Sequence, residues 1–267
     1  MKRMPVVFIA HGSPMNAIED NKYTRNWGEI ARNIPKPKAI LVVSAHWYTN
    51  GTKVMSNANP KMIYDMYGFP KELYEVIYDS QGAPEVAKIA KNLITDFVSL
   101  DDEIDVELDV ELDNEAGYDH GAWSVLLKMY PEKDIPVFEL SIDGGAPPQE
   151  HFKIGKKLRA LRDQGVLILG SGNVVHNLGR IDWEMDGGFE WAEEFDSYIK
   201  SKVLGKKFAD VVDFTKAGSS HKLAVPTPEH FYPLLYVLGA SDESDQITVY
   251  NDDFTMGSLS MTCYLFK

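Results

Sequence analysis

The chain has 267 residues, 44% of them hydrophobic and 25% charged, with 27 basic and 40 acidic side chains that give a net charge of −13. This length suits one α/β domain with a large core. The excess of acidic residues argues against a protein that binds nucleic acids or anionic membranes, because such proteins need a basic surface. No apolar run reaches the roughly 18 residues that a membrane-spanning helix needs.

The first predicted element is a buried strand at Val6–Ala10. The residues before it are basic, as in a signal peptide, but the apolar stretch is short and runs straight into His11-Gly12-Ser13-Pro14. We therefore expect a cytoplasmic protein. Continuous apolar runs are typical of strands in a sheet that is covered on both faces. Three further runs of this kind predict strands at Ala39–Ser44, Pro136–Leu140 and Val166–Leu169.

Helical patterns lie between and after these strands. A helix is predicted to begin near Thr227, with Thr227 as N-cap, Pro228 as the first helical residue and His230 as the third. The other predicted helices cover Tyr23–Asn33, Ala83–Phe97, Gly121–Met129, Pro148–Gln164 and Phe189–Val203.

The remaining predicted strands belong near sheet edges. Ile104–Leu112 alternates strictly between apolar and acidic residues, which indicates a half-exposed strand. Ile247–Tyr250 and Ser258–Phe266 are predicted to form a closing hairpin or edge pair. No repeat, low-complexity tract or Gly/Ser linker divides the chain, so we expect a single domain over residues 1–267. The alternation predicts an α/β fold with a mixed, largely parallel central sheet covered by helices on both faces.

Cysteine usage limits the kind of metal site that the chain can build. Cys263 is the single cysteine, so neither an intrachain disulfide nor a thiolate cage is possible. Its place in an apolar terminal segment favours a buried structural thiol. Nitrogen and oxygen ligands must therefore hold any metal.

Three of the seven histidines follow predicted buried strands. His11 comes directly after the first strand, His46 two residues after the second, and His176 a few residues after Val166–Leu169. The carboxyl ends of parallel strands line the ligand crevice of an open α/β sheet, so these side chains are expected to converge. Gly170-Ser171-Gly172 is interpreted as a tight turn that brings His176 toward the crevice.

His230 adds a fourth candidate for a different reason. At the third position of a helix, the free N–H groups and the helix dipole lower the pKa of a histidine and favour the neutral imidazole that binds metals. Glu229 is the best carboxylate nearby. A triad of two histidines and one carboxylate that uses Glu229 instead of His230 remains open at this point.

The other histidines have weaker signals. His120 follows an edge-like strand, where Asp119 or Asp113 could orient it, or it could cap the next helix. His151 and His221 are predicted to lie at the surface. The sequence lacks a Gly-x-Ser-x-Gly nucleophile elbow, which argues against a serine hydrolase.

Taken together, these motifs resemble those of the class III extradiol ring-cleavage dioxygenases, in particular the 4,5-DOPA dioxygenase-like branch, similar in fold to the catalytic subunit of protocatechuate 4,5-dioxygenase. They follow the family's order over nearly the whole chain. The matching segments are His11-Gly12-Ser13-Pro14, Ser44-Ala45-His46-Trp47, Tyr67-Gly68-Phe69-Pro70, Asp119-His120-Gly121-Ala122-Trp123, Gly170-Ser171-Gly172 with His176-Asn177-Leu178, and Pro226-Thr227-Pro228-Glu229-His230-Phe231.

The resemblance implies a role for each histidine. His11, His46 and His230 are implied as the metal ligands, and His176 as an active-site base close enough to count as a fourth ligand. His120 is implied as the second acid/base or substrate-contacting group. Three protein ligands on one face leave room for substrate at the metal, and a nearby base and acid assist the proton transfers.

The implied reaction is the insertion of O2 into a catechol-type aromatic diol next to its two hydroxyls. The implied cofactor is one divalent metal: Fe(II) for ring cleavage, or Zn(II) as a bound or isolated form. Trp47, Tyr48 or Tyr118 could stack on the substrate ring. We expect a monomer or small homo-oligomer. Two alternatives are a zinc-dependent hydrolase on the same fold and a non-catalytic metal-binding relative.

Overall fold

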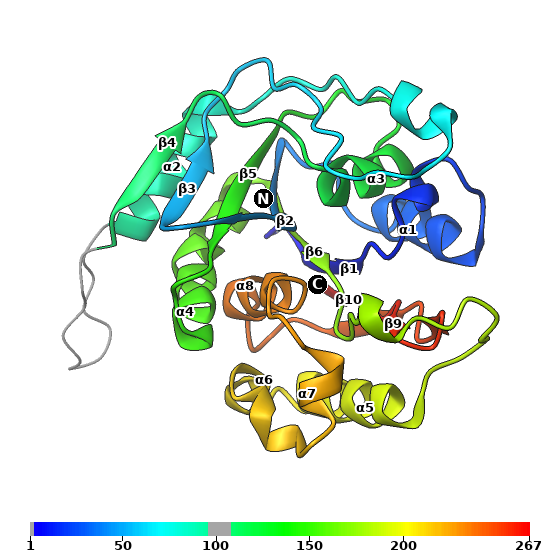
Figure 1. The fold of residues 1–267 in the computed structure, drawn as a ribbon. Helices are drawn as coiled ribbons and strands as arrows, with labels where there is room; N and C mark the ends of the chain where they lie inside the picture. The colour runs from blue at the N-terminus through cyan, green and yellow to red at the C-terminus, as the bar shows by residue number, and fades with distance from the viewer. Residues whose placement is uncertain (1–2, 96–107) are drawn as a thin grey trace.

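The computed structural model describes residues 3–95 and 108–267, which form an α/β fold around one large sheet (Figure 1). Its eight strands lie in the order β4-β3-β5-β2-β6-β1-β10-β7. The predicted fold class is confirmed. The strands are β1 (Val6–Ala10), β2 (Ala39–Thr49), β3 (Thr52–Met55), β4 (Val110–Asp113), β5 (Val137–Asp143), β6 (Val166–Gly172), β7 (Ile247–Tyr250) and β10 (Cys263–Phe266), with β8 (Phe254–Thr255) and β9 (Leu259–Ser260) in a separate pair.

The centre of the sheet is parallel and its margins are mixed. β2 pairs in parallel with β5 and β6, and β6 pairs in parallel with β1. β10 runs antiparallel to both β1 and β7, as expected for a closing pair. β3 runs antiparallel to β5 and parallel to the edge strand β4. The carboxyl ends of β1, β2 and β6 therefore meet at one edge of the sheet.

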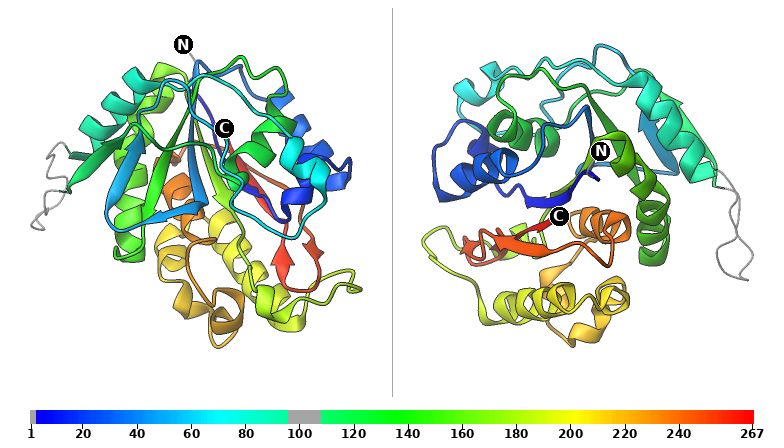
Figure 2. Two further views of the ribbon diagram at one scale, coloured as in Figure 1. Left: turned by 45° about the horizontal axis from the view of Figure 1, so that its top comes forward. Right: turned by 180° about the vertical axis from the view of Figure 1, so that it is seen from behind.

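Helices cover both faces of this sheet (Figures 1 and 2). α3 packs on β2 and β6 from one face, and α8 packs on β1, β2 and β6 from the other. The helices are α1 (Lys22–Arg32), α2 (Pro84–Thr95), α3 (His120–Met129), α4 (Pro148–Leu158), α5 (Glu190–Leu204), α6 (Phe208–Val212), α7 (His221–Ala224) and α8 (Tyr232–Ala240), with 3-10 turns at Pro14–Ala17, Lys71–Glu75, Arg159–Gln164, Leu178–Arg180 and Phe214–Ala217.

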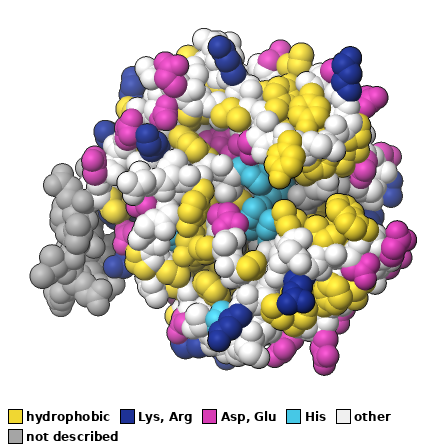
Figure 3. Space-filling model, in the orientation of Figure 1, with side chains coloured by type: hydrophobic (Ala, Val, Ile, Leu, Met, Phe, Trp, Pro, Cys, Tyr) yellow, Lys and Arg dark blue, Asp and Glu magenta, His cyan; other side chains and the backbone are white. Residues whose placement is uncertain are grey.

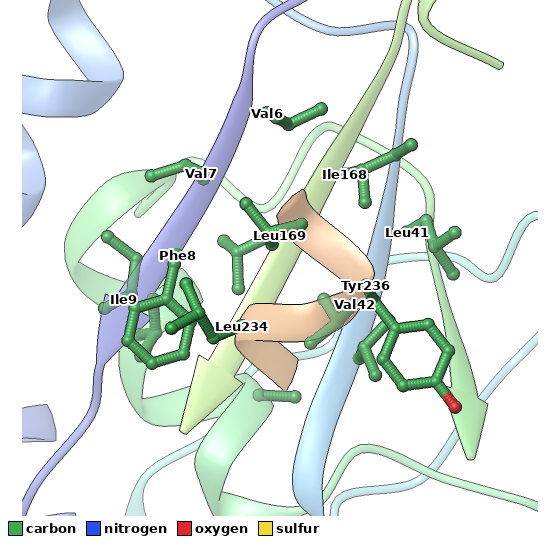
Figure 4. Packing of buried hydrophobic residues seen from close by; sticks show 14 of the residues in the cluster. Val6, Val7, Phe8, Ile9, Leu41, Val42, Ile168, Leu169, Leu234 and Tyr236 are labelled. Carbon is green, nitrogen blue, oxygen red and sulfur yellow. The ribbon is translucent and has the colours of Figure 1, made fainter. Parts of the chain in front are cut away.

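The core lies between the central strands and α8. Every residue of β1 and β6 is buried, because both faces of these strands are covered. Figure 4 shows Leu234 and Tyr236 of α8 beside the side chains of β1, β2 and β6. Cys263 is also fully buried, and its Sγ accepts the Ala10 N–H, which confirms the structural thiol. Among the described residues, no helix is long and apolar enough to cross a membrane.

Two predicted elements extend into the undescribed segment. α2 ends at Thr95 in the described part of the chain, so the last two residues of the predicted helix Ala83–Phe97 lie outside it. The first four residues of the predicted strand Ile104–Leu112 also lie outside the described residues. Its remainder overlaps β4, which stands at the edge of the sheet as expected. The short strand β3 was not predicted.

The prediction of a tight turn at Gly170-Ser171-Gly172 is wrong, because β6 continues through these residues. The two glycines allow the backbone before and at the start of α8 to lie directly on the strand. A Cβ added at Gly172 would lie 2.2 Å from the carbonyl oxygen of His230, and one at Gly170 would lie 2.6 Å from that of Pro233. The glycines therefore set how closely the His230 segment approaches the end of β6.

The predicted helix start at Thr227 is also wrong, since α8 begins at Tyr232. The Thr227 hydroxyl donates to Glu229 Oε1 rather than capping a helix. The Pro228 carbonyl accepts the N–H groups of both Phe231 and Tyr232, which makes the segment a turn that leads into α8. His230 therefore lies in this turn and not in a helix.

Candidate metal centre

The structure brings five histidines together at the carboxyl end of the parallel strands. His11 follows β1, His46 lies in the distal part of β2, and His230 lies in the turn before α8. The ring centroids of these three lie 5.0 Å (His11–His46), 5.3 Å (His11–His230) and 5.0 Å (His46–His230) apart. Figure 3 shows histidine side chains (cyan) at the bottom of a hollow near the middle of one face.

His120 and His176 flank these three histidines, the first beside His46 and the second beside His230. The His120 ring, at the start of α3, lies 3.7 Å from that of His46. The His176 ring stacks on that of His230 at 3.5 Å, with an angle of 5° between the rings. Among the described residues, two sets have ligand atoms that all lie within 4.8 Å of one another: His11, His46 and His120, and His176, Glu229 and His230.

The position of His11 fixes which of its ring nitrogens faces the cluster. The Ser171 hydroxyl donates to the Gly121 carbonyl at 2.6 Å, so its oxygen is free to accept. His11 Nδ1 lies 3.0 Å from that oxygen and therefore carries the proton. The Nε2 lone pair of His11 is left for the cluster.

Asp65 is a site residue that the sequence analysis missed. Its Oδ2 lies 3.0 Å from His120 Nδ1 and 3.4 Å from His46 Nδ1, and its Oδ1 accepts the backbone N–H of His120. The two residues proposed to orient His120 have other partners: Asp119 caps α3, and Asp113 accepts backbone N–H groups of its own loop. One carboxylate thus hydrogen-bonds to the His120 ring and lies beside the His46 ring.

Glu229 stands beside His230. Its Oε1 lies 3.2 Å from His230 Nδ1 and accepts the Thr227 hydroxyl. This contact orients the His230 ring in the same way that Asp65 orients His46. His11, His46 and His230 therefore each have an oxygen partner at Nδ1.

The electrostatics of the cluster favour neutral rings. Burial, followed by the charges of the neighbouring histidines, lowers the pKa of His11 and of His230 well below the ordinary value. Burial also lowers the pKa of His46 to about 3 and that of His176 to about 4. Neutral imidazoles are the form that binds metals.

The facing nitrogens of His11 and His46 provide a test of whether a metal fits here. Their Nε2 atoms lie 3.2 Å apart, while His11 Nδ1 hydrogen-bonds to Ser171 Oγ and His46 Nδ1 lies 3.4 Å from Asp65 Oδ2. Two opposed lone pairs require a cation or a proton between them. A set of neutral imidazole nitrogens suits Zn(II) and Fe(II), so the residues fit a divalent metal.

A cavity of about 250 Å³ adjoins the cluster and shares His46 with it. Of the aromatic residues proposed to contact a substrate ring, Trp47 lines this cavity. Tyr118 is fully buried in the core, where its hydroxyl bonds to backbone carbonyls. The cavity wall is formed by His46, Trp47, Ile63, Asp65, Asp113, Glu115, Ala116, Gly117 and Asp119.

The two remaining histidines lie apart from the cluster. His151 was predicted to face solvent, and this is wrong: it is fully buried, with Nδ1 2.9 Å from the Tyr236 hydroxyl and its ring against Tyr232. It shares the buried face of α4 with Ile154 and Leu158, a spacing that the sequence already contains. The His221 side chain, in α7, bonds only to the carbonyl of Gly218 among the described hydrogen bonds.

Comparison with known proteins identifies relatives over nearly the whole chain. Residues 4–266 match the family described as the catalytic LigB subunit of aromatic ring-opening dioxygenase. The chain is 44% identical to a protein of Escherichia coli K12 named 4,5-DOPA dioxygenase extradiol, over 97% of this chain and 93% of the relative. It is 38% identical to a protein of the same name from Beta vulgaris, over 97% and 95%.

A solved structure has the same fold. The crystal structure of an uncharacterized protein from Escherichia coli K12 superimposes with a TM-score of 0.84 at 40% sequence identity, covering 99% of this chain and all of the other. The predicted family is confirmed by these matches.

Proposed function

Because the chain belongs to the LigB family of aromatic ring-opening dioxygenases, we propose that it cleaves a catechol-type diol with O2, next to the two hydroxyls, at a divalent metal held by His11, His46 and His230. The observation that carries this proposal is the pair of Nε2 atoms of His11 and His46, which face each other at 3.2 Å while each Nδ1 has an oxygen of Ser171 or Asp65 within 3.4 Å.

The Nδ1 contacts favour His230 over Glu229 as the third ligand. Metal-binding histidines usually donate their second ring N–H to an oxygen, which fixes the tautomer and turns the other nitrogen to the metal. Ser171, Asp65 and Glu229 supply that oxygen to His11, His46 and His230 respectively. Glu229 then orients the His230 ring by accepting its Nδ1–H and does not bind the metal itself.

A bound redox-active metal such as Fe(II) would supply the chemistry that lets a diol react with O2. The remaining work falls to the protein. His120 donates its Nδ1–H to Asp65, so its Nε2 can accept a hydrogen bond or a proton from a diol hydroxyl. His176 is neutral at neutral pH, since its pKa is about 4, and is available as the base. The cavity beside His46 offers Trp47 as an aromatic wall for the substrate.

Metal content tests the ligand assignment. H11A, H46A and H230A are expected to lose the ion, whereas E229Q should retain it, because the amide oxygen can still accept the Nδ1–H. H221A is the matched control, as this histidine lies outside the cluster. Full metal retention in H11A and H46A, measured by elemental analysis of the purified variants, would refute the site.

Oxygen uptake tests the reaction. Apo-protein reconstituted with Fe(II) without air should consume O2 when a substituted catechol is added and release a coloured ring-opened product. A zinc hydrolase on the same fold would instead regain activity with Zn(II) and ignore O2. Absence of O2 uptake across a panel of substituted catechols would contradict the proposal.

A further inference from the structure

Glu139 is a buried acid that the proposed reaction does not use. It lies in the middle of β5, with no exposed surface, and neither of its carboxyl oxygens has a donor among the described residues. Asp119, 4% exposed, has one oxygen, Oδ2, in the same situation. Buried polar groups are nearly always hydrogen-bonded, so these three oxygens require an explanation.

The explanation is that the two carboxyl groups lie within hydrogen-bonding reach of each other. Two neighbouring carboxylates in a protein interior cannot both be charged, because neither desolvation nor repulsion is compensated. The pair must share one proton. Asp119 Oδ1 accepts the Ser44 hydroxyl at 2.6 Å and the Ala122 N–H at 3.0 Å, whereas only the backbone N–H of Asp119 approaches the Glu139 carboxyl group. The negative charge therefore belongs on Asp119 and the proton on Glu139.

Asp119 connects this pair to the histidine cluster. It caps α3, whose first two residues are His120 and Gly121. The Gly121 carbonyl accepts the hydroxyl of Ser171, the residue that holds His11 Nδ1. Ser44, which donates to Asp119, lies two residues before His46 on β2. The hydrogen bonds of Asp119 thus connect it to the segments that position His11, His46 and His120.

We infer that Glu139 is kept as a neutral carboxylic acid that donates its proton to Asp119, and that it acts through Asp119 as a positioning residue for His46 and His120. The consequence for metal binding rests on the proposed function, but the protonation of Glu139 does not. Burial and the nearby Asp119 charge raise the pKa of Glu139 well above the usual range, in agreement with this assignment.

Infrared spectroscopy tests the protonation directly. At a pH of about 8, the wild-type protein should show the C=O band of a protonated, hydrogen-bonded carboxylic acid, and E139Q should lack it. D196N is the matched control: Asp196 is a buried acid too, but Ser260 and Thr262 donate to its oxygens, so it is ionised at that pH and its replacement should leave the band. A band that persists unchanged in E139Q would overturn the inference.

Metal affinity tests the positioning. E139Q keeps a donor to Asp119, so its zinc dissociation constant should stay within about threefold of the wild type. E139M has a similar length but no donor, and should bind zinc about tenfold more weakly, the range seen when groups behind metal ligands are lost. Equal zinc affinity in folded E139M and wild type would overturn the positioning role. The infrared result on E139Q stands whether or not E139M folds. Failure of wild-type ring cleavage would count against the proposed function alone.

Discussion

At the scale of single residues, Asp65 controls two histidine rings through one carboxylate. D65N replaces the acceptor at His46 Nδ1 and His120 Nδ1 with an amide that cannot accept equally from both. We expect zinc or iron affinity to fall by about tenfold to a hundredfold, and kcat/KM to fall with it. D113N is the matched control, because Asp113 lines the same cavity without contacting a histidine. Equal losses in both variants, measured by chelator competition, would argue against a specific role for Asp65.

The sequence predicted those site residues that follow a buried strand. It did not predict the site residue that only a tertiary contact brings to the cluster. His11, His46 and His176 were expected to converge because each follows a buried strand, and they do converge. Asp65 lies in a loop, 55 residues before His120, and no period or strand end marks it. Asp119 and Asp113, which are close to His120 in the sequence, were predicted to orient it instead.

At the scale of elements, the contact between β6 and the turn before α8 sets the place of His230. G172A would put a Cβ 2.2 Å from the His230 carbonyl oxygen, so the two segments must separate. We expect a loss of about 1–3 kcal/mol in the free energy of unfolding together with weaker metal binding. G145A, which meets only an Asp143 side-chain oxygen at 3.4 Å, is the control. Wild-type metal affinity in G172A would contradict this account of His230.

The buried face of α5 gives a pH-dependent prediction. Burial raises the pKa of Asp196 to about 6 from an ordinary value of 3.8. A raised acid pKa stabilises the fold below the unfolded value, and this stabilisation is lost as the pH rises through the folded value. Between pH of about 4 and about 7, Asp196 should therefore cost the wild type about 3 kcal/mol of stability, and D196N should be free of that change.

Urea unfolding across this pH range checks the prediction. The difference between wild type and D196N isolates the one group, since other titrating groups contribute equally to both proteins. A difference that does not change with pH, or that changes in the opposite direction, would contradict the assignment of Asp196.

Element boundaries show why sequence patterns were insufficient at the site itself. Helices and strands of the core were predicted because apolar periodicity marks them. A turn was predicted at Gly170-Ser171-Gly172 from its glycines, and a helix start at Thr227–His230 from its N-cap motif. Both predictions used local sequence preferences, and tertiary packing determines the structure of these segments instead. The glycines lie within β6 because only residues without a Cβ let the start of α8 pack against the strand. Thr227 bonds to Glu229 instead of capping a helix.

At the scale of the whole molecule, the acidic character extends into the cavity beside the histidines. Asp65, Asp113, Glu115 and Asp119 are in its wall, and none of the described residues that line it is a lysine or arginine. Figure 3 shows acidic side chains (magenta) beside the hollow that exposes the histidines. This surface should favour a substrate side chain that carries an ammonium over one that carries a carboxylate.

Matched catechols test that preference. A catechol with an aminoethyl side chain should have a kcat/KM higher than one with a carboxyethyl side chain by on the order of tenfold, and E115K should reduce or reverse the ratio. E111Q is the control, because Glu111 pairs with Lys53 outside the cavity wall. Equal kcat/KM values for both substrates would show that the cavity does not receive the side chain.

The central claim is that the histidine cluster serves the insertion of O2 into an aromatic diol. The most direct measurement is the mass of the product formed from a catechol by the Fe(II)-reconstituted protein under isotopically labelled O2. The account predicts a ring-opened product whose carboxylate carries one oxygen atom from the labelled O2, because the aldehyde oxygen exchanges with water, and no such product from H46A. A ring-opened product whose carboxylate carries no oxygen from O2 would contradict it.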